Sequence, residues 1–126
     1  MIEDLQVIMV TATVLKSPSG YVGFECKGHA GYMQKGKDIV CSAISMLTVN
    51  TANSIMTLSE TGIDVEEKDG FISWTFKDVP DAKATLLMDS LLIGLGSVVE
   101  EYGKKYLKLE IKEVSHDQVK PSVICS

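Results

Sequence analysis

Apolar and polar residues along the first part of the chain follow the pattern of β-strands. The segment LQVIMVTATVL (5–15) is rich in β-branched residues and is long enough for a strand. SPSG (17–20) has turn chemistry, because proline presets φ and glycine adds conformational freedom. YVGFECKG (21–28) then returns as a second strand. The pattern therefore predicts an opening β-hairpin.

The hydrophobic period changes after Asp38, where apolar residues begin to recur at helical spacings. These residues are Val40, Ile44, Leu47, Ile55 and Leu58. They predict an amphipathic helix over 39–58, with Asp38 as a favoured N-cap residue and Gly62 marking the end. A second hairpin follows, in which IDVEE (63–67) and FISWTF (71–76) flank a KDG turn.

A second helix opens at Pro80 and Asp81 and ends at Gly103, a typical C-terminal cap. Its apolar positions include Ala84, Leu87, Leu91, Leu95, Val98 and Tyr102. Gly94 and Gly96 inside this helix each cost about 1 kcal/mol relative to alanine. They indicate either close packing against another backbone or a tolerated weak point, and the sequence leaves both interpretations open.

The last segment, YLKLEIKE (106–113), alternates cleanly and predicts a strand with one solvent-exposed face. The element order is therefore ββαββαβ. Hairpins imply mostly antiparallel pairing, so we expect an α+β fold in which a mostly antiparallel sheet packs with two long helices. We expect a single domain over 1–113 and a C-terminal tail over 114–126 without a clear pattern.

Composition and charge narrow the class of protein. The 126 residues are 45% hydrophobic and 23% charged, as in ordinary globular proteins. The net charge is −5 and there is no basic run, which argues against nucleic acid and favours encounter with a basic partner. Neither a membrane span nor a signal peptide is apparent, so we expect a cytoplasmic protein. We therefore expect Cys26, Cys41 and Cys125 to be reduced thiols.

The candidate chemistry lies in GHAGYMQKGKDIVCSAIS (28–45). If Asp38 caps the helix, Cys41 is the third helical residue. The unsatisfied N–H groups and partial positive charge of a helix N-terminus favour the reactive thiolate there. Ser45 lies one helical turn further on the same face, where its hydroxyl can bond the sulfur or a substrate group. A solvated or back-bonded serine is the ordinary alternative.

His29 leaves the second strand as the connection to the helix begins. Gly28, Gly31 and Gly36 permit turns in this connection, which can bring the imidazole near the sulfur of Cys41. Imidazole titrates near neutrality and suits the role of base for a thiol. A cysteine buried in the core is an equally good interpretation of Cys41 from the residues alone.

Other chemistries fit the sequence less well. Cys26, His29 and Cys41 supply three potential zinc ligands without paired spacing, so we expect no metal. The glycines form neither a phosphate loop nor a dinucleotide fingerprint, and we expect no cofactor. A thiol redox sensor at Cys41 is a weaker alternative, because no resolving cysteine is evident nearby in the sequence.

The pairing of GHAGY with GKDIVCSAIS resembles the ribosomal-processing cysteine protease family, called Prp. The similarity extends over the element order and the segment VVEEYGKKYLKLEI, to about residue 113. The resemblance implies that Cys41 is the nucleophile and His29 its partner, and that Asp38 and Ser45 match further residues of the motif. The serine directly after Cys41 is often alanine in the family.

This resemblance also implies a substrate and an assembly. Such proteases remove a short N-terminal extension from large-subunit ribosomal protein twenty-seven, and they form homodimers. The expected activity is that of a cysteine endopeptidase using a Cys–His dyad. A non-catalytic dimeric module that binds a ribosomal protein is the alternative from another functional class.

Overall fold

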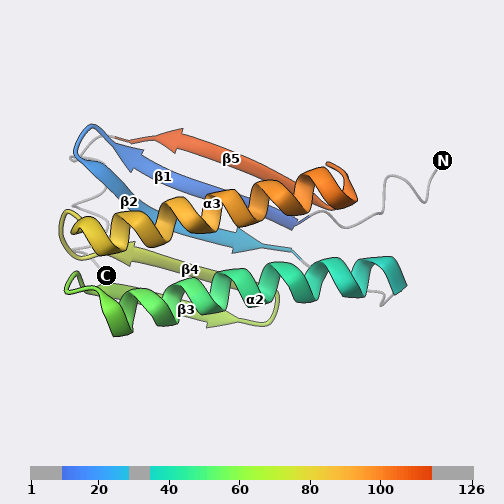
Figure 1. Ribbon diagram of the computed structural model, residues 1–126, viewed down its shortest axis with the longest axis horizontal. Helices are drawn as coiled ribbons and strands as arrows, with labels where there is room; N and C mark the ends of the chain where they lie inside the picture. Colours follow the sequence, from blue (N-terminus) through green and yellow to red (C-terminus); the bar gives the residue numbers. More distant parts are fainter. Residues whose placement is uncertain (1–9, 29–34, 115–126) are drawn as a thin grey trace.

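The computed structural model describes residues 10–28 and 35–114, and the side chains of 10–28 and 39–114. The elements follow the order ββαββαβ, as predicted (Figure 1). They are β1 (Val10–Ser17), β2 (Gly20–Lys27), α2 (Lys35–Leu58), β3 (Ile63–Lys68), β4 (Phe71–Phe76), α3 (Ala82–Tyr102) and β5 (Leu107–Glu113). β1 continues two residues beyond the predicted end at Leu15, and residues 5–9 of the predicted strand lie outside the described part.

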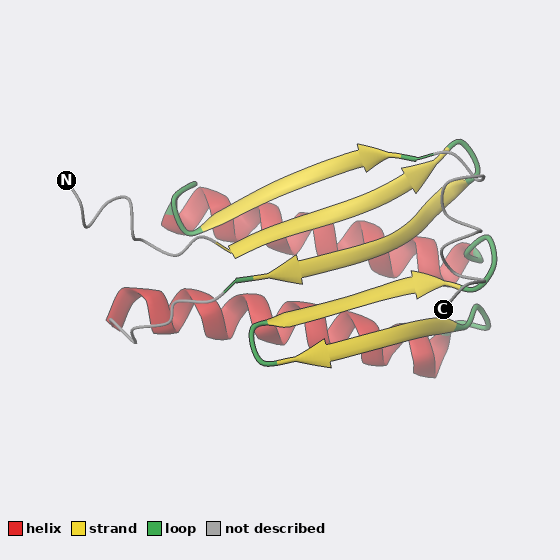
Figure 2. Cartoon of the chain, turned by 180° about the vertical axis from the view of Figure 1, so that it is seen from behind, coloured by secondary structure: helices red, strands yellow, loops and turns green. Residues whose placement is uncertain are grey.

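The five strands form one mixed sheet in the order β3-β4-β2-β1-β5. The β1–β2, β2–β4 and β3–β4 pairs are antiparallel, whereas β1 and β5 are parallel. Both helices cover the same face of the sheet, which leaves the other face open (Figures 1 and 2). The architecture is the predicted two-layer α+β fold.

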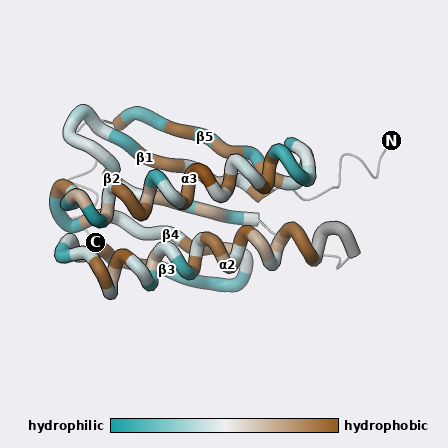
Figure 3. The backbone as a smooth tube through the Cα atoms, in the orientation of Figure 1, coloured by the Kyte–Doolittle hydropathy of each residue, from teal (hydrophilic) through white to brown (hydrophobic). Residues whose placement is uncertain are grey.

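The core lies between the helices and the sheet. Strand alternation directs Ala12, Phe24 and Trp74 toward the helices, and the rings of Phe24 and Trp74 are 4.8 Å apart. Apolar positions recur along both helices and along the strands (Figure 3). By length and composition alone α2 and α3 could each cross a membrane, a test that core helices also pass. Here their apolar stripes pack against the sheet.

The ends of α3 agree with the prediction. Asp81 is the N-cap, and its carboxylate accepts the N–H of Ala84 at 2.8 Å. Gly103 is the C-cap with φ of 103°, and its N–H donates to the carbonyl of Val99. A positive φ of this kind favours glycine. Met88, which the predicted stripe left out, is fully buried, whereas Tyr102 is exposed.

The start of α2 differs from the prediction. The helix begins at Lys35, so Gly36 lies in its first turn and Asp38 is a helical residue rather than the N-cap. The segment 35–38 contains no apolar residue, so hydrophobic periodicity gives no signal there, and its glycine favours a loop. The added turn gives the N–H groups of residues 39–42 carbonyl partners four residues back, which offsets the propensity cost.

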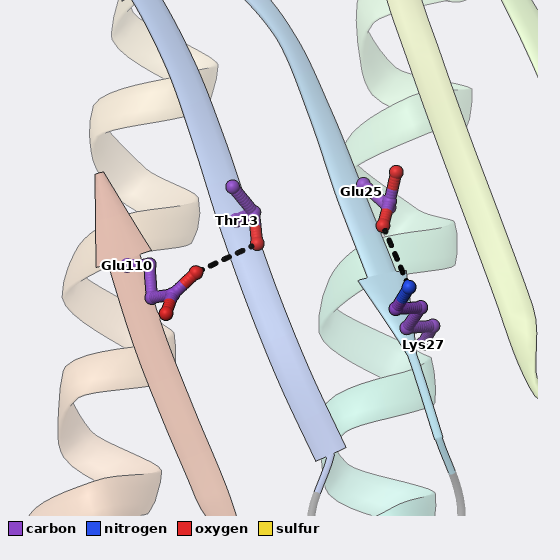
Figure 4. Close-up of polar contacts among 4 residues, drawn as sticks. All are labelled: Thr13, Glu25, Lys27 and Glu110. Carbon is purple, nitrogen blue, oxygen red and sulfur yellow. Dashed lines mark hydrogen bonds and ion pairs between the residues drawn. The ribbon is translucent and has the colours of Figure 1, made fainter. Parts of the chain in front are cut away.

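The open face of the sheet is polar. Thr13 donates to Glu110 at 3.4 Å across the β1–β5 pair, and Lys27 lies 3.8 Å from Glu25 along β2 (Figure 4). The close-up shows these side chains in front of the strands, with the helices behind. The wet face predicted for β5 is therefore the open one, on which Lys108 pairs with Glu110 at 3.0 Å.

Candidate active site

A cleft of about 210 Å³ opens between the N-terminal half of α2 and the adjacent end of the sheet. Its walls come from the start of β1, the end of β2, one side of α2 and the turn between β3 and β4. Buried apolar side chains form the interior, among them Val10, Ile44 and Ile72. The exposed hairpin residues Glu67 and Asp69 stand at the rim. The cleft thus has a mixed apolar and polar lining and is charged at one edge.

One stripe of α2 faces this cleft. Cys41, Ile44, Ser45 and Thr48 all line it, at the spacing of three and four residues that places side chains on one side of a helix. Cys41 is half-buried and packs against the hydrophobic core. Ser45 is exposed. The structure therefore brings the predicted nucleophile and the serine one turn away to the same cleft.

Gly28 lines the cleft as well. Its N–H donates to the carbonyl of Gly70 at 2.9 Å, which ties the end of β2 to the β3–β4 turn. Its φ of 103° requires the conformational freedom of glycine, in agreement with a turning role. His29 and Gly31 lie outside the described residues. Of the predicted loop glycines, Gly36 is in α2 as described above.

The early start of α2 changes the surroundings of Cys41. Cys41 is the seventh helical residue, not the third, because the helix begins at Lys35. Its backbone N–H lies inside the helix, where N–H groups bond the carbonyls four residues back. The effect of the helix dipole falls off within the first turn. The expectation that Cys41 is the third helical residue, with unsatisfied N–H groups beside it that favour a thiolate, is therefore wrong for this structure.

Cys26 is a second thiol on the cleft, and the sequence did not single it out for chemistry. It faces the helices from β2 and is 6% exposed. Burial is the largest of the causes that raise its pKa to about 12, and electrostatic interaction with Cys41 and Glu25 acts in the same direction. Strand alternation with Phe24 indicated the inward direction, but its closeness to Cys41 depends on where α2 lies over the sheet. The structure thus places a second cysteine on the cleft that Cys41 lines, although none was evident near it in the sequence.

The rim residues of the β3–β4 turn were also not foreseen as part of a site. The KDG signal predicted a turn, and the structure has that turn between β3 and β4. Lys68 at this turn pairs with Glu66 at 3.1 Å and approaches the ring of Phe71. Sequence pattern alone carries no information on which helix end the turn will approach.

Comparison with known proteins identifies the family. The model of the cysteine protease Prp family matches residues 9–108. The ribosomal processing cysteine protease Prp of Bacillus subtilis is 29% identical over 101 residues, which are 75% of this chain and 90% of that protein. Its Staphylococcus aureus counterpart is 27% identical over 99 residues, covering 76% of this chain and 93% of that protein.

Solved structures agree. The essential ribosomal processing protease Prp from S. aureus in complex with a substrate peptide has a TM-score of 0.75 and 25% identity. The same protease with a covalently linked product peptide has a TM-score of 0.73 and 26% identity. Each alignment covers 82% of this chain and 100% of that one. The predicted family, fold class and enzyme class, a cysteine protease, are confirmed. This chain belongs to the cysteine protease Prp family.

Proposed function

We propose that the protein is a cysteine endopeptidase that removes the N-terminal extension of large-subunit ribosomal protein twenty-seven during ribosome assembly. The observation that carries this proposal is the position of Cys41, half-buried on a cleft in a chain of the Prp family. A related protease from S. aureus binds a substrate peptide and a covalently linked product peptide. A thiol beside a cleft with both apolar and polar lining suits a peptide, which offers side chains and backbone hydrogen-bonding groups.

A dyad of Cys41 and His29 is the proposed catalytic machinery. His29 is bonded to Gly28, which lines the same cleft as Cys41. The position of Gly28 thereby supports the assignment of His29 as the base.

In the proposed reaction, His29 accepts the thiol proton of Cys41 as the sulfur attacks the scissile carbonyl carbon. The C–N bond then breaks while His29 returns the proton to the leaving amine, and a thioester remains on Cys41. Water gives a proton to His29 as its oxygen attacks the thioester carbon, the C–S bond breaks, and His29 returns the proton to the sulfur of Cys41. The extension leaves as a carboxylic acid, and the thiol of Cys41 is restored.

Ser45 and Asp38 have supporting roles in this proposal. Ser45 lines the cleft one helical turn from Cys41, so its hydroxyl can bond the sulfur or a backbone group of the substrate. Asp38 does not cap α2, so we assign it the remaining role, which is to orient the imidazolium form of His29 by its charge.

The proposal also covers the localisation, oligomeric state and domain bounds of the enzyme. We place it in the cytoplasm, as a homodimer that acts without metal or cofactor and does not bind nucleic acid directly. The proposed protease domain covers 1–113 and the tail 114–126. A net charge of −5 favours encounter with a basic precursor.

Mass spectrometry of the ribosomal precursor tests the proposal directly. The precursor is incubated with wild type, Cys41→Ala and His29→Ala. We expect a single cut by the wild type and an intact precursor with either variant. Circular dichroism of the variants confirms that they are folded. Cleavage by Cys41→Ala would contradict the assignment of the nucleophile, and an intact precursor with folded wild type would contradict the substrate.

A further inference from the structure

The proposed mechanism does not use Cys26, although this thiol shares the catalytic cleft. Cys26 lies in β2 opposite Ala12 of β1 and Ile72 of β4, and it faces the helical layer like Phe24 two residues earlier. Cys41 faces the same cleft from α2. Two thiols from different elements therefore line one cavity, one of them buried and the other partly open to solvent.

Partial exposure makes Cys41 the thiol that a small oxidant reaches first. Hydrogen peroxide reacts with thiolates in proportion to their accessibility and thiolate character. The 6% exposure of Cys26 protects this second thiol from direct attack. An oxidised Cys41 thus has a reduced thiol beside it on the same cleft.

We propose that Cys26 is the resolving cysteine for Cys41, so that peroxide converts the pair into a reversible Cys26–Cys41 disulfide. In the first step the sulfur of Cys41 attacks a peroxide oxygen, the O–O bond breaks, and water leaves with the thiol proton. Cys41 is then a sulfenic acid. In the second step the sulfur of Cys26 attacks that of Cys41, the S–O bond breaks, and the hydroxyl leaves as water with the Cys26 proton.

The disulfide would close the cleft and protect the nucleophile. A disulfide holds its two Cβ atoms about 3.8 Å apart, so the bridge would tie α2 to β2 across the cleft. It also stops Cys41 from passing to the sulfinic and sulfonic acids, which are irreversible. The raised pKa of Cys26, which is caused mainly by its burial, slows the second step.

Formation of the disulfide does not depend on protease activity, whereas the effect of the disulfide on cleavage rests on the proposed function. The test therefore begins with intact-mass measurement of the folded full chain and of its Cys125→Ser variant, which removes the remaining cysteine. After limited peroxide treatment we expect both proteins to lose the mass of two hydrogen atoms. Peptide mapping without reduction should recover the peptides of Cys26 and Cys41 as one linked species.

Cys26→Ala is the decisive variant. We expect peroxide to add two or three oxygen atoms to Cys41 in this variant, and cleavage not to return with dithiothreitol. In the wild type and in Cys125→Ser, dithiothreitol should restore the starting cleavage rate in full. If folded wild type and Cys125→Ser gain oxygen atoms and form no linked peptide, the proposal is wrong. The mass shift tests whether the disulfide forms even if the substrate proves to be different. The peptide map tests the same point even if Cys26→Ala does not fold.

Discussion

Asp81 joins the start of α3 to the segment that follows α2. Its carboxylate accepts the N–H groups of Ala84 and Glu60 at 2.8 and 2.9 Å and the hydroxyl of Ser59 at 3.1 Å. Its own N–H donates to the Thr61 hydroxyl at 2.8 Å. These hydrogen bonds, led by the one from Ala84, lower the pKa of Asp81 below its usual value. One residue thus fixes both a helix end and the path of a loop.

Replacing Asp81 tests this role. Because the pKa is lowered in the folded state, the charged form contributes stability above the ordinary aspartate pKa, and this stability is lost as the pH falls through the folded pKa. We expect Asp81→Ala to lower the melting temperature at neutral pH more than Asp81→Asn, since asparagine still caps. The difference between wild type and Asp81→Asn should shrink in thermal melts from about pH 7 to about pH 3. A difference that does not change with pH would contradict the role of the carboxylate charge.

Single residues were predictable where the local backbone decides their role. Asp81 and Gly103 followed from helix-end preferences, and both have the expected roles. Cys41 and Ser45 were identified by the helical spacing and the family motif, and the structure puts both on one cleft. Cys26 could not be identified as part of the site, because its relation to Cys41 depends on how α2 crosses the sheet.

At the scale of elements, Gly94 lies where α3 packs against the Leu47 side chain of α2. A Cβ atom at Gly94 would lie 2.9 Å from Cδ2 of Leu47, whereas one at Gly96 would meet nothing within 4 Å. The structure therefore assigns a different one of the two open interpretations, close packing or a tolerated weak point, to each glycine. Gly94 permits the close helix contact, and Gly96 carries the helix-propensity cost without such a contact.

This contrast predicts different outcomes for one substitution at two positions. Gly96→Ala should raise the free energy of unfolding by about 0.5–1 kcal/mol, because alanine favours the helix. At Gly94 the gain should be smaller, because the end of the Leu47 side chain has to move aside for the new Cβ atom. Urea unfolding of both variants measures the difference. In a Leu47→Ala background Gly94→Ala should regain the full benefit, and an equal benefit at both glycines without that change would contradict the contact.

The sequence predicted which segments are helices and which are strands, because the spacing of apolar residues is a local property of each segment. It did not predict where α2 starts or which strand β5 pairs with. The polar segment 35–38 gives no periodic signal, so the sequence predicts a helix that begins after Asp38, whereas α2 begins at Lys35. The alternation in β5 shows one wet face but not its partner, and the parallel pairing with β1 arises because α3 carries the chain across the sheet to its far edge.

At the scale of the whole molecule, β5 completes the sheet at its edge beside β1. Leu107 is 1% exposed, and the parallel register runs from Val10 with Leu107 to Lys16 with Glu113. The N–H of Val114 adds a hydrogen bond of 2.7 Å to the carbonyl of Lys16. The strand therefore extends beyond residue 108, where the match to the family model ends. Residues 109–113 thus continue the pairing with β1 beyond the matched segment.

Two truncations test this boundary. A chain ending after Val114 keeps all five strands, so we expect its melting temperature and its cleavage rate to equal those of the full chain. A chain ending after Tyr106 loses β5, uncovers Val10 and Ala12 on β1, and should not show a cooperative unfolding transition. The chain that ends after Val114 lacks Cys125 but keeps Cys26 and Cys41, so the peroxide-induced disulfide should form in it unchanged. If its melting temperature falls clearly, the tail contributes to the fold and the proposed domain boundary at residue 113 is wrong. If stability is kept but cleavage is lost, the tail instead belongs to the substrate site.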